Sequence, residues 1–558
     1  MVRRIFGFLY KENHTLNQAA LLLGLFAFLS QVLAFLRDRL LAHIFGASAE
    51  LDIYYAAFRV PDFIFVTVAS LVSLSVLIPF IVEKEAEGRE VLRQFLDNIF
   101  SFFSILIILV SGLAYLLMPT IAEALFKGFT ASALDQVIFI SRILLLSPII
   151  LGLSNLFGSL TQTYNRFTIY ALAPILYNAG IIIGIILLAE RLGIMGVSIG
   201  VVIGASLHAL VQVPFVIKLG LFPRFSPKLD FSLISQVAKI SLPRTLALST
   251  SSIALIFLVS FASLMPTGSI SILSFSFNLQ AVLISTIGVS YSLAAFPTLS
   301  RYFRESNFKA FLEQTATTAR FILFWSLPLS ALFIVLRAQI VRVVLGSGLF
   351  DWNDTRLTAA ALAIFVLSST FQCLGLLFVR GFYSAGFTRT PLFISLVSTA
   401  TMLAGTWGLV KLFYLSEGFR YFISALLKVE DLPGTAVLML PLGFSIATIL
   451  NGLFLWVMFE RKFKGFSRGV VRALFESLSA AVFMGATAYL GLKVLAPSLN
   501  TDSLMGIFFQ GFGAGLLAIV AGIVVLILLK NRELVSVWSV VRGKFWRAKI
   551  IATDSDIV

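Results

Sequence analysis

The sequence predicts an all-α integral membrane protein with about fourteen transmembrane helices, each needing about 20 apolar residues. The chain has 558 residues, of which 59% are hydrophobic and only 12% are charged. Soluble proteins carry about 25% charged residues, so this chain could not cover a water-exposed surface. Its apolar runs are long and continuous, as in Leu21–Phe35, Ile99–Met118 and Met505–Leu529. This pattern favours helices over the short alternating strands of a membrane barrel.

Charged breaks between the apolar runs define the predicted spans in chain order. They are 16–36, 54–82, 95–118, 136–163, 168–189, 194–217, 237–263, 270–299, 316–336, 357–384, 390–414, 436–459, 471–495 and 505–529. Several exceed the length of one bilayer crossing, so we expect tilted or kinked helices. The charged stretch near 415–435 predicts a short amphipathic segment at the membrane surface.

A weak internal repeat divides the spans. Phe58-Arg59 followed by Pro79 matches Phe277-Asn278 followed by Pro297, and Arg166 matches Arg389. Both matches lie about 220 residues apart, as expected for a transporter built from two repeats. The repeat predicts an N-terminal six-helix lobe over 1–218, a C-terminal six-helix lobe over 219–460, two additional transmembrane helices over 461–530 and a cytoplasmic basic tail over 531–558.

The net charge of +15 belongs to the loops. In a soluble protein such a charge would indicate a nucleic-acid partner, but cytoplasmic loops of membrane proteins are rich in Lys and Arg. Placing both termini in the cytoplasm puts three basic loops there, 218–239, 301–309 and 460–472, together with the basic tail. We therefore predict a multi-pass protein with both ends inside and no nucleic-acid partner.

The sequence offers no pattern typical of an enzyme or a metal protein. It has one cysteine, Cys373, and three widely separated histidines, which give no metal-ligand spacing. No nucleotide-binding loop or nucleophile–base pair is present in the sequence. We expect no cofactor and no metal, so any uphill transport would be coupled to the membrane potential or an ion gradient.

The densest ionisable cluster lies around the first two spans. Charged groups at membrane depth are costly and usually face a cavity or a partner. Helical spacing places Ser30 and Arg37 on one face, and the same seven-residue spacing relates Asp52 to Arg59. Arginine binds phosphate through two parallel N–H hydrogen-bond donors. The presence of Arg37 and Arg59 in these spans therefore predicts an anion-binding cavity. The alternative is that Arg37, Asp38 and Arg39 pair with each other or with lipid phosphate at the interface.

Three stretches carry a resemblance to a known family. They are Ala42–Ala47 with Asp52 and Ala57–Asp62, Asn165–Phe167 with Ala171–Pro174 and Asn178, and Gly381–Ala385 with Thr388–Pro391. The chain resembles the MurJ (MviN) lipid II flippases of the multidrug/oligosaccharidyl-lipid/polysaccharide (MOP) exporter superfamily. The resemblance implies two six-helix lobes in a V plus two C-terminal helices, and transport of lipid II across the bacterial cytoplasmic membrane. It matches Arg37, Asp52 and Ser30 to family cavity positions.

The chain departs from the family at three cationic cavity positions. The family arginines align with Gln31, Phe65 and Asn278. We expect Gln31 and Asn278 to face the substrate, and Arg39 and Arg59 to compensate for the missing charge.

The leading hypothesis is therefore a monomeric flippase for lipid II working by alternating access, with lipid II and membrane lipids as its partners. Asp52 is expected to pair with an arginine and help close a gate. The missing arginines keep open an exporter of another polyprenyl-linked glycan or of drugs. A non-transporting membrane scaffold is the third hypothesis.

Overall fold

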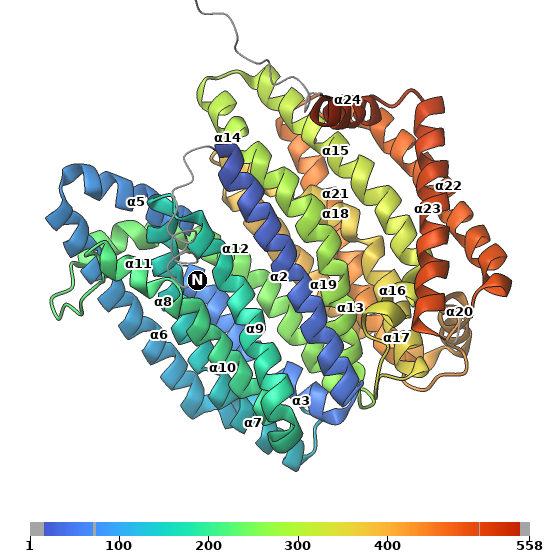
Figure 1. Ribbon diagram of the computed structural model, residues 1–558, viewed down its shortest axis with the longest axis horizontal. Helices are drawn as coiled ribbons and strands as arrows, with labels where there is room; N and C mark the ends of the chain where they lie inside the picture. The colour runs from blue at the N-terminus through green and yellow to red at the C-terminus, as the bar shows by residue number, and fades with distance from the viewer. Residues whose placement is uncertain (1–15, 71–73, 501–502, 547–558) are drawn as a thin grey trace, which may run out of the picture. The chain divides into compact units, whose positions relative to one another are not determined.

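The computed structural model describes residues 16–70, 74–500 and 503–546, and within them every regular element is a helix (Figure 1). In chain order the α-helices are α2 Leu16–Phe45, α3 Ala49–Ala57, α4 Arg59–Ile64, α5 Leu74–Glu87, α6 Arg89–Leu125, α7 Ala131–Leu144, α8 Leu146–Thr163, α9 Phe167–Leu192, α10 Ile194–Leu210, α11 Val213–Lys218, α12 Phe231–Ser263, α13 Ser269–Leu283, α14 Ser290–Arg304, α15 Phe308–Val335, α16 Arg337–Val344, α17 Trp352–Leu367, α18 Ser369–Ser384, α19 Arg389–Leu415, α20 Glu417–Leu427, α21 Met439–Lys462, α22 Val471–Leu495, α23 Leu504–Leu528 and α24 Arg532–Trp546. Two π-helical turns, η1 Phe65–Ala69 and η3 Ile284–Val289, interrupt this series, and short 3₁₀ turns lie at Thr435–Leu438, Ser467–Gly469 and Ala496–Ser498.

The predicted class, an all-helical membrane protein, is confirmed. Ten helices of the described residues are long and apolar enough to cross a bilayer, or eleven if the bent pair α17 and α18 counts as one span. Every predicted span falls on one helix or on a broken helix, but the count of fourteen stays a prediction.

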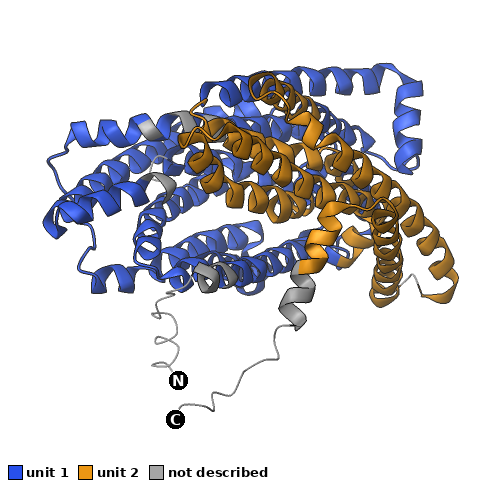
Figure 2. Cartoon of the chain, turned by 90° about the horizontal axis from the view of Figure 1, so that it is seen from above, with its two compact units in different colours: residues 1–276, 344–361, 388–447 blue, residues 277–343, 362–387, 448–558 orange. Residues whose placement is uncertain are grey.

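Contacts divide the chain into two compact units, which Figure 2 colours separately. Unit 1 comprises residues 1–276, 344–361 and 388–447, and unit 2 comprises 277–343, 362–387 and 448–558. These units reflect the density of contacts and do not test the predicted lobes. The boundaries at 218, 460 and 530 therefore stay predictions.

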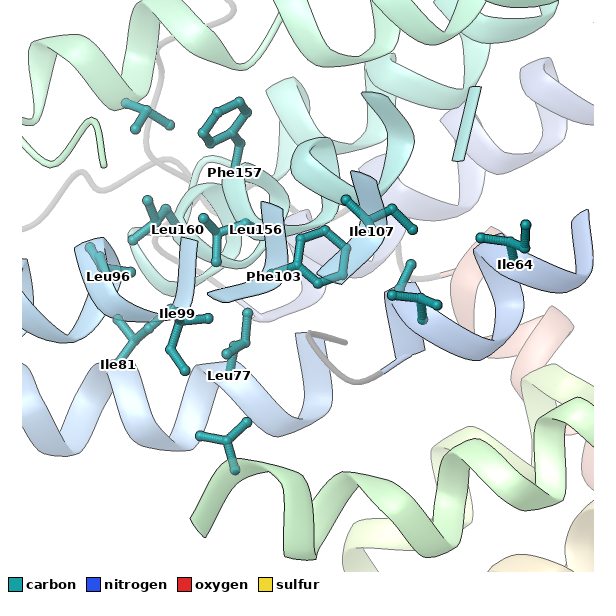
Figure 3. Packing of buried hydrophobic residues seen from close by; sticks show 14 of the residues in the cluster. Ile64, Leu77, Ile81, Leu96, Ile99, Phe103, Ile107, Leu156, Phe157 and Leu160 are labelled. Atoms are coloured by element: carbon teal, nitrogen blue, oxygen red, sulfur yellow. The ribbon is translucent and has the colours of Figure 1, made fainter. Parts of the chain in front are cut away.

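Unit 1 has a large apolar core between α5, α6 and α8 (Figure 3). Leu77 and Ile81 of α5 meet Ile99 and Phe103 of α6, and Leu156 of α8 lies in the same cluster. In lipid such packing stabilises a bundle by close van der Waals contact, because the tails are as apolar as the side chains. Part of the predicted site lies on α3 and α4, and this core holds the helices that follow them in the chain.

Glycines set the close approach of α9 and α10 in unit 1. A Cβ added to Gly184 would collide with the backbone of Gly200, and one added to Gly180 would collide with Gly204. The two helices therefore pack backbone to backbone, as small residues allow in membrane bundles. The small-residue stripe Gly196, Gly200 and Gly204 of α10 forms this contact with α9.

We expect Gly184→Ala to destabilise the protein by about 1–3 kcal/mol, because the collision is with rigid backbone and one helix must shift. Thermal unfolding of the purified protein measures this. Gly405→Ala on α19 is the matched control, since nothing lies within 4 Å of a Cβ there. Equal melting temperatures for the two variants would contradict the packing assignment.

The internal repeat has a structural counterpart. The π-helical turn η1 follows α4, and η3 follows α13, at positions about 220 residues apart, which matches the spacing of the sequence repeat. Each is followed by a helix with an internal proline, Pro79 in α5 and Pro297 in α14. π-Helical turns are rare and often lie at functional sites. They mark the second and eighth predicted spans as equivalent elements.

The predicted surface segment near 415–435 contains the amphipathic helix α20. Its end is fixed by Arg356, whose guanidinium donates to both carboxylate oxygens of Asp431 at 2.6 and 2.7 Å and to the carbonyl of Lys428 at 2.7 Å. The hydrogen bond from Arg356 lowers the pKa of Asp431. The contribution of this pair is therefore present at neutral pH and is lost as the pH falls through the lowered pKa.

Candidate functional site

Arg37 of α2 is held by two neighbours in unit 1. Its Nε and Nη2 donate to Oδ1 of Asp38 at 2.9 and 2.8 Å, and its Nη1 donates to Oδ1 of Asn178 at 3.1 Å. Asp38 and Asn178 are both buried. The buried carboxylate compensates the charge of the arginine, as charges removed from water require.

Ser30 belongs to the same cluster. The Nδ2 of Asn178, on α9, donates to the Oγ of Ser30 at 3.3 Å and to the carbonyl of Pro174 at 3.2 Å. Asn178 thus bridges Ser30 and Arg37, which lie two turns apart on α2. The prediction that Ser30 and Arg37 share one helix face is confirmed.

Asp52 has a local structural role that its sequence position did not indicate. Its carboxylate is 4% exposed and lies at the N-terminus of α13. It accepts hydrogen bonds from the backbone N–H groups of Gly268 and Ser271, both at 2.7 Å, and from the Ser271 hydroxyl at 2.6 Å. A carboxylate at this place satisfies orphan donors of the helix and interacts favourably with its dipole. Among the described residues Asp52 forms no ion pair within 4 Å, so its pairing with an arginine stays a prediction.

Arg59 begins α4 and is less satisfied than Arg37. Its Nη2 donates to the Ser274 hydroxyl at 3.3 Å. Its Nε is buried and has no hydrogen-bond partner among the described residues. Arg59 and Asp52 both contact the first turns of α13, which confirms that their seven-residue spacing places them on one face.

The two arginines therefore differ in what they can do. Arg37 is neutralised by a buried carboxylate, whereas Arg59 has one long hydrogen bond to a neutral hydroxyl and a buried donor to spare. A buried charged donor without a partner is costly unless a ligand satisfies it. Of the two, Arg59 is the better candidate for binding an anionic group such as a phosphate.

The remaining predicted site residues are Arg39, Gln31 and Asn278. Arg39 is half-buried on α2, and its Nη1 donates to the carbonyl of Val344 at 3.4 Å. Gln31 is half-buried on the same helix, and Phe65 packs against the apolar core of unit 1. Asn278 lies in α13 within unit 2, which we describe by itself.

The sequence reasoning did not assign three contributors, Asn178, Ser271 and Ser274, to the site. Asn178 was recognisable as a polar residue in an apolar span. The two serines had no distinguishing signal, because serine is frequent in this region and their roles depend on the fold. No group of three or more potential metal ligands occurs among the described residues.

A bundle of apolar helices with half-buried arginines near broken spans is typical of a membrane transporter. The family model described as lipid II flippase MurJ matches residues 41–509, which is most of the chain. The chain belongs to the MurJ lipid II flippase family, and its members are transporters and not enzymes.

Relatives agree with this assignment, and solved structures have the same fold. A probable lipid II flippase MurJ of Buchnera aphidicola subsp. Baizongia pistaciae is 25% identical over 497 residues, covering 88% of this chain and 91% of the relative. The structure of a lipid II flippase MurJ in an inward closed conformation has a TM-score of 0.70 at 22% identity, covering 92% of this chain and all of that one. An inward-facing multidrug resistance MATE family transporter of the MOP superfamily has a TM-score of 0.63 at 14% identity, covering 79% and 96%.

Proposed function

We propose that this chain is a flippase that moves lipid II across the bacterial cytoplasmic membrane by alternating access. The observation that carries the proposal is Arg59, a half-buried arginine whose Nε is buried and has no hydrogen-bond partner among the described residues. A pyrophosphate offers such a donor the anionic oxygens it lacks. The match of the family model over residues 41–509 supports the lipid-linked substrate.

In this proposal Arg37 acts differently from Arg59. Asp38 and Asn178 hold Arg37 in one orientation, so a ligand would meet a pre-organised and partly neutralised group. Arg59 supplies a positive charge that forms no ion pair within 4 Å among the described residues, although the nearby Asp62 carboxylate interacts with it electrostatically. Arg39, Gln31 and Asn278 remain proposed contacts to the sugar and phosphate groups, and Ser30 supports Asn178.

The remaining parts of the proposal follow from the sequence. Both termini lie in the cytoplasm, the protein acts as a monomer, and transport needs no cofactor. Coupling to the membrane potential or an ion gradient supplies the energy. The basic residues of the extreme N-terminus, with Arg547 and Lys549, lie outside the described residues, so the orientation rests on the sequence.

Growth of bacteria depleted of their own flippase tests the proposal. We expect the wild-type chain to restore growth and Arg37→Ala to fail. Because Arg37→Ala leaves the buried Asp38 charge unpaired, an immunoblot and the double variant Arg37→Ala/Asp38→Ala separate loss of folding from loss of function. Full growth with a stably folded variant lacking Arg37 would remove that residue from the site.

A second candidate is an exporter of another polyprenyl-linked glycan. The neutral residues at Gln31, Phe65 and Asn278 favour it, because family members carry arginine there by resemblance. Thermal stabilisation of the purified chain by lipid II and by other polyprenyl-linked sugars distinguishes the two. Stabilisation only by another glycan would replace the lipid II proposal.

A further inference from the structure

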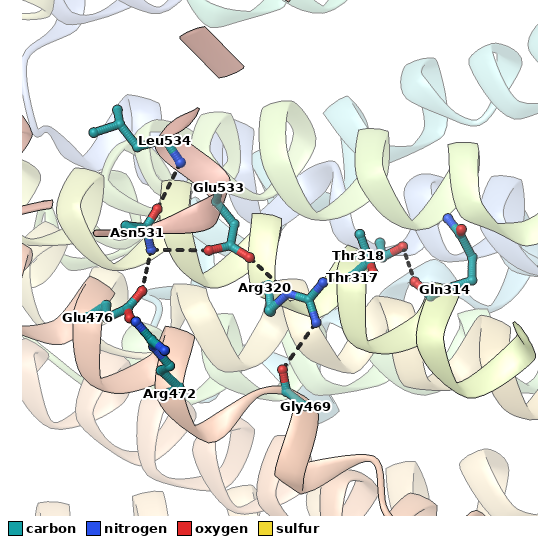
Figure 4. Close-up of polar contacts among 10 residues, drawn as sticks. All are labelled: Gln314, Thr317, Thr318, Arg320, Gly469, Arg472, Glu476, Asn531, Glu533 and Leu534. Atoms are coloured by element: carbon teal, nitrogen blue, oxygen red, sulfur yellow. Dashed lines mark hydrogen bonds and ion pairs between the residues drawn. The ribbon is translucent and has the colours of Figure 1, made fainter. Parts of the chain in front are cut away.

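The last of the described helices, α24, is held on the rest of unit 2 by a polar network (Figure 4). Asn531 caps α24, since its Oδ1 accepts the Leu534 N–H at 2.8 Å. Its Nδ2 donates to Glu476 of α22 at 2.7 Å and to Glu533 of α24 at 3.1 Å. One amide side chain thus joins two buried carboxylates from different helices.

Each carboxylate also has its own arginine. The Nε of Arg472 donates to Glu476 at 2.6 Å, and the Nε of Arg320, on α15, donates to Glu533 at 2.8 Å. The Nη1 of Arg320 also donates to the carbonyl of Gly469, in the loop between α21 and α22, at 3.2 Å. The network therefore joins α24 to the α21–α22 loop and to α15 within one end of unit 2.

Three acidic groups at this end are held by hydrogen bonds within the protein. Glu476 and Glu533 are both buried in the network. Glu460 accepts hydrogen bonds from the N–H groups of Gly465 and Ser467 at 2.8 and 2.7 Å. Glu476 and Glu533 are therefore paired with arginines, and all three carboxylates are hydrogen-bonded within the protein.

The basic groups at the same end face outward. The exposed ones are Arg461, Lys462, Lys464, Arg468, Arg472, Lys530 and Arg532. The surface is therefore strongly positive, even though acidic residues are present in the same segments.

Exposed apolar side chains accompany this charge. Leu534 and Val537 of α24 pack against unit 2, whereas Val535 and Trp538 are 66% and 67% exposed. Three residues separate this helix from the end of α23 at Leu528, so we place it at the membrane surface. A helix at that depth with tryptophan and basic residues outward is typical of binding to a charged lipid interface.

We propose that this surface, formed by the α21–α22 loop and α24, binds the headgroups of anionic phospholipids. Basic residues close to an anionic leaflet each strengthen binding about fivefold, and the apolar residues insert below the phosphates. The network positions α24 so that Arg532, Val535 and Trp538 face the lipid. This proposal does not depend on the transported substrate.

Mass spectrometry of the purified full-length chain, titrated with dioleoylphosphatidylglycerol or dioleoylphosphatidylcholine, tests the proposal. We expect preferential retention of phosphatidylglycerol, weakened by salt. The double variant Arg468→Gln/Arg532→Gln should bind it about 30-fold more weakly, while retention of phosphatidylcholine stays unchanged.

The matched control is Lys127→Gln/Arg191→Gln, which removes two exposed basic residues elsewhere on the chain. It should retain phosphatidylglycerol as the wild type does. Equal retention of both lipids by the wild type, or equal losses in both double variants, would overturn the proposal. A dimer that is lost in the Arg468→Gln/Arg532→Gln variant would also overturn it and assign the surface to a second copy of the chain.

Discussion

Arg59→Gln should abolish transport while leaving the protein as stable as the wild type. In the structure Arg59 contributes one hydrogen bond of 3.3 Å to a neutral hydroxyl, and its buried Nε is unsatisfied. Removing such a group relieves a desolvation penalty and breaks little. A bound pyrophosphate would lose a charge-assisted contact of about 1.5–3 kcal/mol, which is about 10- to 150-fold in affinity.

The conservative variant sharpens this prediction. Arg59→Lys keeps the charge but loses the planar fork that engages two oxygens, so we expect partial transport. Arg142→Gln is the control, because Arg142 is a half-buried arginine of α7 whose Nε donates to the carbonyl of Tyr115 at 3.2 Å, away from the site. Growth of flippase-depleted cells and thermal unfolding of each purified variant provide the two readouts. Normal growth with Arg59→Gln would exclude Arg59 from substrate binding.

Asp52→Ala should have the opposite signature, with a large loss of stability. The substitution removes three hydrogen bonds from the start of α13 and leaves two buried N–H groups without an acceptor. Each unsatisfied buried donor costs about 1–3 kcal/mol, so we expect a destabilisation of about 3 kcal/mol or more. Asp52→Asn retains one acceptor oxygen and should lose about half as much.

Thermal unfolding in detergent measures this effect. Glu417→Ala is the control, because Glu417 also lies in the first turn of a helix, α20, but its side chain is 92% exposed. Surface substitutions of this kind change stability by about 0.5 kcal/mol or less. If Asp52→Ala melted with the wild type and only transport failed, Asp52 would act on the substrate or gate and not as a helix cap.

The fold class could be predicted from the sequence because the solvent around a protein constrains its amino-acid composition. A chain with 12% charged residues must meet lipid, and the length of its apolar runs then selects helices. The breaks within spans did not follow. The predicted span 54–82 is divided into α3, α4, η1 and α5, since an apolar run does not encode where its helix changes pitch.

The candidate site was predicted only in part, because helical periodicity identifies residues on one face but not the partners of those residues. Helical periodicity placed Ser30 with Arg37 and Asp52 with Arg59, and the structure confirms both pairs. Periodicity gives no information about partners on distant segments, so Asn178 and Ser274 were not paired with the arginines. The distinction between a neutralised Arg37 and an unsatisfied Arg59 also required the fold, because both look alike in sequence.

The most direct test of the account is translocation of fluorescent lipid II by the purified chain in liposomes, read out as access of the probe to an external quencher. The account predicts rapid translocation with the wild type and with Arg142→Gln, and none above empty liposomes with Arg59→Gln. Equal rates for Arg59→Gln and the wild type, or no translocation by the wild type, would contradict it.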